Sequence, residues 1–458
     1  MPDDLDAVAL ATLVRRGEAS PDELARAAIA RIDPELAAVE YAAYAKPLMG
    51  TPGGALYGVP TFVKDNTDVA GMPTNHGTAA FTARPAARHG RYTRQFLSTG
   101  MTVLGKSRLP EFGFNAGSEY ESAAPVRNPW NLDLSPGASS GGAAALVSSG
   151  AVPIAHANDG GGSIRIPAAC CGLVGLKPTV DRHVRGDQDR HLPVHIGSEG
   201  VLTRTVRDTA AFVAACEDYW RNPGLPPIGL VEGPARRRLR VGLMLDTVTG
   251  AVLDAQTRTA VENTAKLLER LGHDVSPVPM PVGKQFVDDF LLYWGFLASL
   301  VARFGRLAFS RAFDATRLDG LTQGLRRLYL HNAHHSSGAL YRLRRVPRAY
   351  ARMFRRHELV LSPVVAHIAP PLGHLSPTVP FDELLHRLVA YVAYTPLHNV
   401  AGAPAISLPM GMASEGVPIG VMLSAAHGDE RTLLEVAYAL EAEQPWPRVA
   451  SRGLRGTR

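Results

Sequence analysis

The chain has 458 residues, of which 46% are hydrophobic and 20% are charged, a composition typical of an ordinary soluble globular protein with ample core. Its formal net charge of +6 comes almost wholly from arginine, because only six of the 48 basic residues are lysine. The three cysteines show neither a disulfide framework nor a zinc-ligand spacing, so Cys170, Cys171 and Cys216 are expected to be buried thiols, and no metal or cofactor is expected.

Helices are expected at the N-terminus. Residues 6–16 carry apolar side chains at helical spacing. A second helix should begin at Ser20, which can cap it, while Pro21 suits the first turn and Glu23 completes a capping box. Residues 1–14 contain three acids and no basic residue, unlike a secretory signal, so a cytoplasmic protein is expected.

A lysine ends the first predicted strand. Residues 53–65 are interpreted as a turn that leads into a strand, and residues 101–104 as a second short buried strand. Arginine keeps its proton in proteins, whereas a desolvated lysine can lose it, so Lys64 in an apolar segment of this arginine-rich chain indicates a deprotonatable amine. The alternative is a surface lysine that pairs with Asp65.

Residues 100–107 satisfy the G-x-x-x-x-G-K-S pattern of a phosphate-binding loop. That mechanism needs a glycine-rich loop between a strand and a helix, but the four middle residues are typical of a strand and Pro110 follows closely. We therefore interpret the segment as a strand in which Lys106 is structural. Residues 111–131, rich in Gly, Ser and Asn, are expected to form a loop near the site.

Two clusters of small residues stand at residues 137–142 and 159–163. Three consecutive glycines before Ser163 let the main chain turn sharply and leave N–H groups unshielded, as a site for a developing oxyanion requires. Taken singly, such clusters are more often loops or helix-packing points. Here both are embedded in apolar sequence without a charge run, which favours a catalytic role.

Strands and helices are expected to alternate through the C-terminal half. Thr205 and Asp208 predict a capping box for a helix that runs through Cys216. The following elements are predicted as a connection, a buried strand, an amphipathic helix and a core strand, at residues 221–233, 239–245, 257–271 and 359–363.

The apolar and basic stretches after residue 280 raise the question of membranes and nucleic acid. Residues 290–302 form an uncharged apolar run of 13 residues, too short to span a bilayer, so a core or pocket-lining helix and no membrane span are expected. Residues 303–356 contain 13 arginines and two aspartates. Sparse aromatics and the lack of an RNA-binding motif favour a solvated helical excursion over a nucleic-acid partner. The spacing of His331, His334 and His335 is a poor metal signal.

The small-residue segment resembles the signature of the amidase signature family, whose members include bacterial amidases, fatty acid amide hydrolase and the amidase subunit of glutamyl-tRNA amidotransferase. The resemblance is close over about residues 58–216 and looser over residues 399–441. It places the nucleophile at Ser163 and the family's cis-serine at Ser139. The catalytic lysine falls on Lys64, at the end of the segment G-V-P-T-F-V-K.

The same resemblance implies further site residues. Side chains that support the site by hydrogen bonds and charge pairing are Ser140, Asp159 and Arg165. The oxyanion hole is formed by the backbone N–H groups of Gly160, Gly161, Gly162 and Ser163. Apart from the resemblance, the loop expected at residues 111–131 offers Phe112, Asn115 and Ser118 as candidate pocket-lining residues. The segment departs from the commonest family pattern at Ala138, Ala143 and Gly160, and none of these changes removes a catalytic side chain.

The resemblance implies an α/β fold with a large, mostly parallel mixed β-sheet covered by helices on both faces. Length alone would suggest about three domains, but the family implies one domain over residues 1–458. Within it we expect N-terminal helices at about residues 1–50, a signature core at about residues 55–216 and a variable substrate-access region at about residues 280–357.

The implied activity is hydrolysis of a small-molecule carboxylic amide, or of an ester or carbamate, through a serine acyl-enzyme. Two alternatives stay open. The chain could be the amidase subunit of an amidotransferase that supplies ammonia to a partner, or a catalytically silent binding protein of the same fold. A homodimer is also compatible with the sequence, and no residue pattern identifies the substrate.

Overall fold

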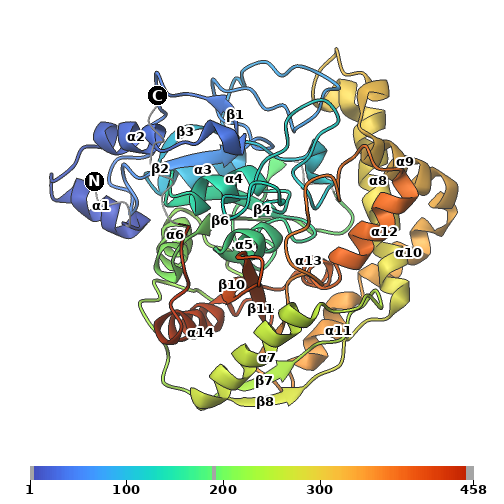
Figure 1. The fold of residues 1–458 in the computed structure, drawn as a ribbon. Coiled ribbons are helices and arrows are strands. Elements are labelled where there is room, and N and C mark those ends of the chain that lie inside the picture. The colour runs from blue at the N-terminus through green and yellow to red at the C-terminus, as the bar shows by residue number, and fades with distance from the viewer. Residues whose placement is uncertain (1–4, 188–191, 450–458) are drawn as a thin grey trace.

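The computed structural model describes residues 5–187 and 192–449 and is built around two β-sheets (Figure 1). The small sheet has the strand order β1-β3-β2, and the large sheet has the order β4-β6-β5-β10-β11-β9-β7-β8. The strands are β1 (Val39–Ala42), β2 (Pro60–Lys64), β3 (Thr102–Ser107), β4 (Ile154–Asp159), β5 (Val174–Lys177), β6 (Ser198–Thr203), β7 (Arg240–Leu243), β8 (Asp274–Pro277), β9 (Leu359–Pro363), β10 (Ala405–Met412) and β11 (Pro418–Ala425).

Helices surround the sheets, and α8 to α12 gather on one side of the molecule (Figure 1). The helices are α1 (Ala7–Arg15), α2 (Pro21–Ala30), α3 (Arg91–Ser98), α4 (Gly141–Ser148), α5 (Arg165–Cys171), α6 (Val206–Tyr219), α7 (Ala255–Arg270), α8 (Lys284–Ala308), α9 (Gly320–Asn332), α10 (Ser336–Leu343), α11 (Val346–Met353), α12 (Phe381–Tyr391), α13 (Pro396–Ala401) and α14 (Glu430–Glu443).

The central strands of the large sheet are buried on both faces. Successive side chains of a strand point to opposite sides, so two neighbouring residues show what covers each face. In β6, Val201 belongs to an apolar cluster with side chains of α6, α7 and α14. Its neighbour Leu202 belongs to a different cluster, with side chains of α4 and α5. Helices therefore cover both faces, as expected.

The mixed α/β sheet is confirmed, but its pairing differs from the mostly parallel arrangement that we expected. Among the described strands of the large sheet, five neighbouring pairs are antiparallel and two, β9–β7 and β7–β8, are parallel. The connections explain the difference. A turn of five residues joins β10 to β11 and forces them antiparallel, whereas the crossover helix α7 between β7 and β8 allows parallel pairing.

The two predicted capping boxes have different outcomes. At α2, the Glu23 N–H donates to the Ser20 side chain, and the Glu23 carboxylate accepts from the Ser20 N–H, so the box is complete. At α6, Thr205 accepts from the Asp208 N–H as expected. The Asp208 carboxylate instead accepts the N–H groups of Ala7 and Val8, at 2.9 and 3.0 Å, and thereby attaches α1 to α6.

Helix α8 is longer than the apolar run that predicted it, with 25 residues instead of 13. Among the residues that the structure describes, it is the one helix with the length and composition to cross a membrane. It packs against α9 and α10 and carries Phe290 and Trp294 into the cavities described below, which accounts for its apolar face. The region of residues 303–356 is mainly helical, as predicted: it begins with the end of α8 and continues, after a segment at residues 309–319 that is mostly irregular, with α9, α10 and α11.

The segment that resembles a phosphate loop is a strand, as predicted. β3 runs from Thr102 to Ser107, and the Lys106 side chain is fully buried. Its Nζ lies 3.2 Å from the Asp65 carboxylate. Lys106 is therefore structural, and it occupies the carboxylate that we had considered as a partner for Lys64.

Both small-residue clusters lie where a helix begins. The first leads into α4, all eight residues of which are buried. The second connects the end of β4 to the start of α5. An added Cβ at Gly142 would lie 2.6 Å from the Ala38 carbonyl oxygen, so the absence of a side chain is what lets α4 approach the neighbouring backbone.

Candidate active site

Lys64 ends strand β2 with its side chain fully buried. Its Nζ lies 2.7 Å from Ser139 Oγ, 2.9 Å from Ser140 Oγ and 2.7 Å from Asn158 Oδ1. All three partners are neutral oxygen atoms. Burial therefore lowers the pKa of Lys64 to about 7, against the opposing effect of the Glu199 and Asp159 carboxylates. Near neutral pH both the ammonium and the free amine are populated.

A buried histidine holds the backbone of Lys64 in place. The Lys64 N–H donates to His156 Nδ1 at 3.1 Å, and His156 Nε2 lies 2.9 Å from Glu199 Oε2. Because Nδ1 accepts a hydrogen bond, the ring proton must be on Nε2, which donates to the carboxylate. Burial also lowers the pKa of His156, so this imidazole is neutral. The sequence contained no pattern that identified His156 or Glu199.

Ser139 follows a cis peptide bond, Ala138–Ser139, at the position where the resemblance implies a cis-serine. The loop before it is supported by Ser118, whose hydroxyl donates to the Gly137 carbonyl at 3.0 Å. Ser139 and Ser163 are 3% and 8% exposed and line the same cleft. The structure thus brings Lys64, Ser139, Ser140 and Ser163 into one site.

Asp159 organises the glycine loop that precedes Ser163. Its carboxylate accepts the Gly162 N–H at 2.7 Å and the Ile164 N–H at 3.2 Å, and it pairs with the Arg165 guanidinium at 2.9 Å. Although burial opposes ionisation, the charge and hydrogen bonds of Arg165 hold the pKa of Asp159 well below its usual range. The supporting positions implied for Asp159 and Arg165 are therefore adjacent in space.

One of the four N–H groups expected to form the oxyanion hole, that of Gly162, already donates a hydrogen bond within the protein. The Gly162 N–H points at Asp159 and does not face the cleft, which differs from our expectation. Among the residues that the structure describes, no hydrogen-bond acceptor faces the N–H groups of Gly160, Gly161 and Ser163. Gly162 is needed for another reason: its φ is 141°, and an added Cβ would lie 2.5 Å from Thr395 Oγ1.

Two residues from the C-terminal half complete the support of this loop. Asn399 Nδ2 donates to the Asp159 carbonyl at 3.0 Å, and Asn399 Oδ1 accepts from Arg165 at 2.7 Å. Thr395 Oγ1 donates to the Gly161 carbonyl at 2.6 Å. The looser resemblance over residues 399–441 had assigned no site residue to this segment. The polar Asn399 at the start of an otherwise apolar segment was the signal for a role at the site.

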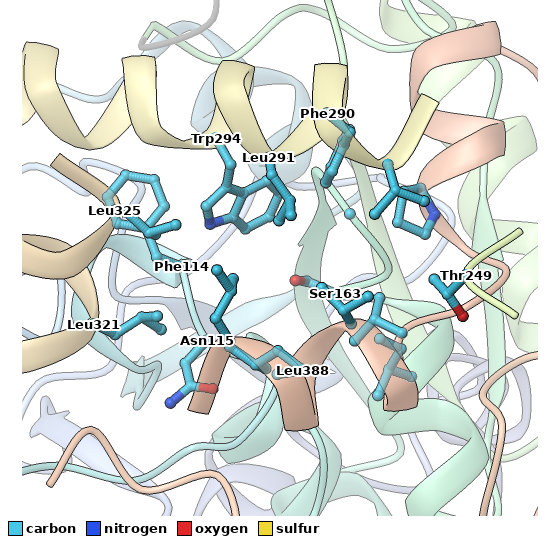
Figure 2. Close-up of a pocket in the computed structure, with 18 of the residues that line it drawn as sticks. Phe114, Asn115, Ser163, Thr249, Phe290, Leu291, Trp294, Leu321, Leu325 and Leu388 are labelled. Atoms are coloured by element: carbon cyan, nitrogen blue, oxygen red, sulfur yellow. The ribbon is translucent and has the colours of Figure 1, made fainter. Parts of the chain in front are cut away.

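Two cavities of different character meet at Ser163. The inner cavity has a volume of about 90 Å³ and is lined almost entirely by apolar side chains, several of which appear in Figure 2. The outer cleft is larger, about 1260 Å³, and more polar. Four residues line both: Gly113, Phe114, Ser163 and Trp294. Ser139 lines the outer cleft and is absent from the walls of the inner cavity.

The three candidate pocket residues are placed differently from one another. Phe112 lines the outer cleft, and Asn115 lines the inner cavity. The Asn115 amide donates to the Leu375 carbonyl at 2.7 Å, so it also ties the loop to a distant segment. The fully buried Ser118 lines neither of these two cavities and supports the backbone before Ser139.

Within residues 5–187 and 192–449, no group of three or more His, Cys, Asp or Glu side chains is arranged to hold a metal ion. The three cysteines are free and buried, and burial raises the pKa of each thiol.

Comparison with known proteins gives a consistent result. The Amidase family model matches residues 9–434. A protein of Mycobacterium tuberculosis (strain ATCC 25618 / H37Rv) named "Putative amidase AmiC" is 50% identical over 455 residues, with 97% of this chain and 96% of that protein covered. The 6-aminohexanoate-cyclic-dimer hydrolase of Pseudomonas sp. (strain NK87) is 34% identical, with 96% and 95% covered. A solved structure of 6-aminohexanoate cyclic dimer hydrolase with substrate matches with a TM-score of 0.86 at 29% identity, covering 97% of this chain and 98% of that one.

Proposed function

The chain belongs to the amidase family and is an amidohydrolase acting on carbon–nitrogen bonds, and we propose that Ser163 is its nucleophile, Ser139 its proton shuttle and Lys64 its base. The observation that carries the assignment is the 2.7 Å contact between Lys64 Nζ and Ser139 Oγ in a fully buried setting that lowers the pKa of Lys64 to about 7. A buried amine with this pKa is a free base over much of the neutral range.

The reaction begins with two proton transfers. Neutral Lys64 takes the proton of Ser139, and Ser139 takes the proton of Ser163. Ser163 Oγ bonds to the amide carbon, and the carbonyl electron pair moves onto oxygen. The N–H groups of Gly160, Gly161 and Ser163 then stabilise the oxyanion. When the tetrahedral intermediate collapses, the carbon–nitrogen bond breaks, the shuttle returns its proton to the amine, and water later hydrolyses the Ser163 ester.

The positions of the two cavities support one orientation of the bound amide. The leaving nitrogen must receive its proton from Ser139 and so must lie on the side of Ser163 where Ser139 is exposed. Ser139 lines the outer cleft. We therefore assign the amine to the outer cleft and the acyl group to the inner cavity. The apolar walls of that cavity favour an uncharged hydrocarbon acyl group.

The test is hydrolysis by the purified chain alone of a panel of aryl and alkyl amides of graded acyl length, including 6-aminohexanoate cyclic dimer because of the relatives that hydrolyse it. We expect turnover without a partner subunit and loss of turnover in Ser163→Ala. An enzyme that needs a second subunit to release ammonia would instead be an amidotransferase component. Folded protein without turnover of any amide would indicate a binding role.

A trapping experiment tests the covalent step. Hydroxylamine should intercept the Ser163 ester and give hydroxamate in competition with the acid. Two substrates with the same acyl group and different amines pass through the same intermediate, so their hydroxamate-to-acid ratios should be equal. A ratio that follows the leaving group, with no acylated Ser163 found by mass spectrometry after rapid quench, would contradict the mechanism.

A further inference from the structure

Trp294 stands at the boundary between the two cavities. It projects from α8 on the side where Ser163 lies, and it lines both the inner cavity and the outer cleft (Figure 2). Of the other residues that line both, Gly113 has no side chain, Ser163 is the proposed nucleophile and Phe114 packs against the indole. The indole is thus the largest side chain at this boundary.

The position of the indole is fixed from three sides. Phe290, one turn earlier on α8, has its ring 5.2 Å from the indole, and Phe114 makes an edge contact at 6.0 Å. On the third side, an added Cβ at Gly161 would lie 2.9 Å from the six-membered ring of the indole. The missing side chain at Gly161 is therefore what lets Trp294 rest against the proposed oxyanion loop.

We propose that Trp294 is a specificity-determining residue that closes the inner cavity against the outer cleft and limits the acyl group to short and medium chains. The proposal rests on the proposed function and on its placement of the acyl group in the inner cavity. The inner cavity, at about 90 Å³, is much smaller than the outer cleft, at about 1260 Å³, so a growing acyl chain fills the inner cavity first. A longer chain would have to pass the indole into the outer cleft.

The prediction is tested with acyl p-nitroanilides of two to fourteen carbons, which share one leaving amine. For the wild type, kcat/KM should rise with acyl length to an optimum within the series and then fall, once the chain fills the inner cavity. Trp294→Ala joins the inner cavity to the outer cleft, so the ratio of kcat/KM for the twelve-carbon to the six-carbon substrate should rise by about tenfold or more. Trp294→Phe keeps part of the wall and should give an intermediate ratio.

Two matched controls separate this effect from general loosening of α8. Phe296 is an aromatic residue of the same helix that contacts Tyr293 and Tyr329 and lines neither cavity. Phe296→Ala should keep the wild-type chain-length profile. Leu297 lines only the outer cleft. Leu297→Ala should change the preference among amines and leave the acyl ratio as it is.

Two results would refute the proposal. An unchanged acyl ratio in folded Trp294→Ala, with thermal unfolding close to that of the wild type, would refute the proposal. A changed preference among amines at a fixed acyl group, without change in the acyl series, would mean that Trp294 acts on the amine and not on the acyl group, and would refute it too. If Trp294→Ala does not fold, Trp294→Leu carries the same test. Failure of the proposed function would be recognised by a different observation, because amide turnover would then be absent in the wild type or would persist in Ser163→Ala.

Discussion

The ionisation of Lys64 should set the acid side of the pH–rate profile. Only the neutral amine can accept the proton of Ser139, so kcat/KM should fall as the pH falls through the pKa of Lys64, which is about 7. At pH 6 about one tenth of the enzyme carries neutral Lys64, and the rate should be about one tenth of its plateau. Lys64→Arg should abolish turnover at every pH, because a guanidinium does not lose its proton.

Glu199 allows a sharper test of this assignment. Burial lowers the pKa of Lys64, and the Glu199 carboxylate is the largest influence that raises it. Glu199→Gln removes the charge but keeps an oxygen that can accept the proton of His156 Nε2. Without the carboxylate the ammonium form of Lys64 is less stable, so the acid limb should move to lower pH while the plateau stays close to that of the wild type.

The size of the shift can be read from the rate at one pH. If the acid limb moves by one pKa unit, equivalent to about 1.4 kcal/mol, the rate at pH 6 should rise about fivefold relative to the plateau. Asp68→Asn is the matched control, because Asp68 also lines the outer cleft, whereas the carboxylates that raise the pKa of Lys64 are those of Glu199 and Asp159. The assay is kcat/KM for one amide from pH 5 to 9. An acid limb that stays in place in Glu199→Gln, or moves to higher pH, would show that Lys64 is not the group that titrates.

Three further outcomes are expected. Ser163→Ala should lower kcat by about 10³-fold or more with the fold intact, and Ser139→Ala nearly as much; circular dichroism and single-turnover kinetics check both. Lys64→Met should abolish activity but stabilise the protein by roughly 2 kcal/mol at pH 6, because it relieves a burial cost of about 5 kcal/mol and loses hydrogen bonds worth about 1 kcal/mol each. Since unfolded Lys64 keeps its proton up to its ordinary pKa, the free energy of unfolding of the wild type should rise between pH 7 and 10. Denaturant unfolding should therefore show the stability difference between Lys64→Met and the wild type becoming smaller over this pH range. Gly162→Ala should lose activity and lower Tm because its Cβ would lie 2.5 Å from Thr395 Oγ1, whereas Gly160→Ala, with open space around its Cβ, should keep the wild-type Tm.

Local elements were predictable from the sequence where local chemistry determines them. The capping box at Ser20 formed because both of its partners lie within four residues of one another. The pairing of the large sheet was not predictable in the same way. It depends on which connections are short turns and which contain a crossover helix, and the expected parallel arrangement came from the resemblance and not from these connections.

Contacts between distant segments account for most of what the sequence left open at the site. Asn399 lies 240 positions after Asp159 and still donates to its carboxylate. The inner cavity is likewise walled by separate segments that include α8, α9 and α12. No spacing along the chain indicates that Trp294 will contact Gly161, because that contact depends on how α8 packs beside the glycine loop that precedes Ser163.

The two buried lysines of the small sheet show why this matters for chemistry. Lys64 and Lys106 lie on the neighbouring parallel strands β2 and β3, both in apolar sequence and both fully buried. Lys106 faces the Asp65 carboxylate at 3.2 Å, which stabilises its charge. Lys64 faces the neutral oxygens of Ser139, Ser140 and Asn158, which do not. The strand sequence makes either lysine a candidate base, and only the partner that each one meets across the fold separates a structural ammonium from an amine that can accept a proton.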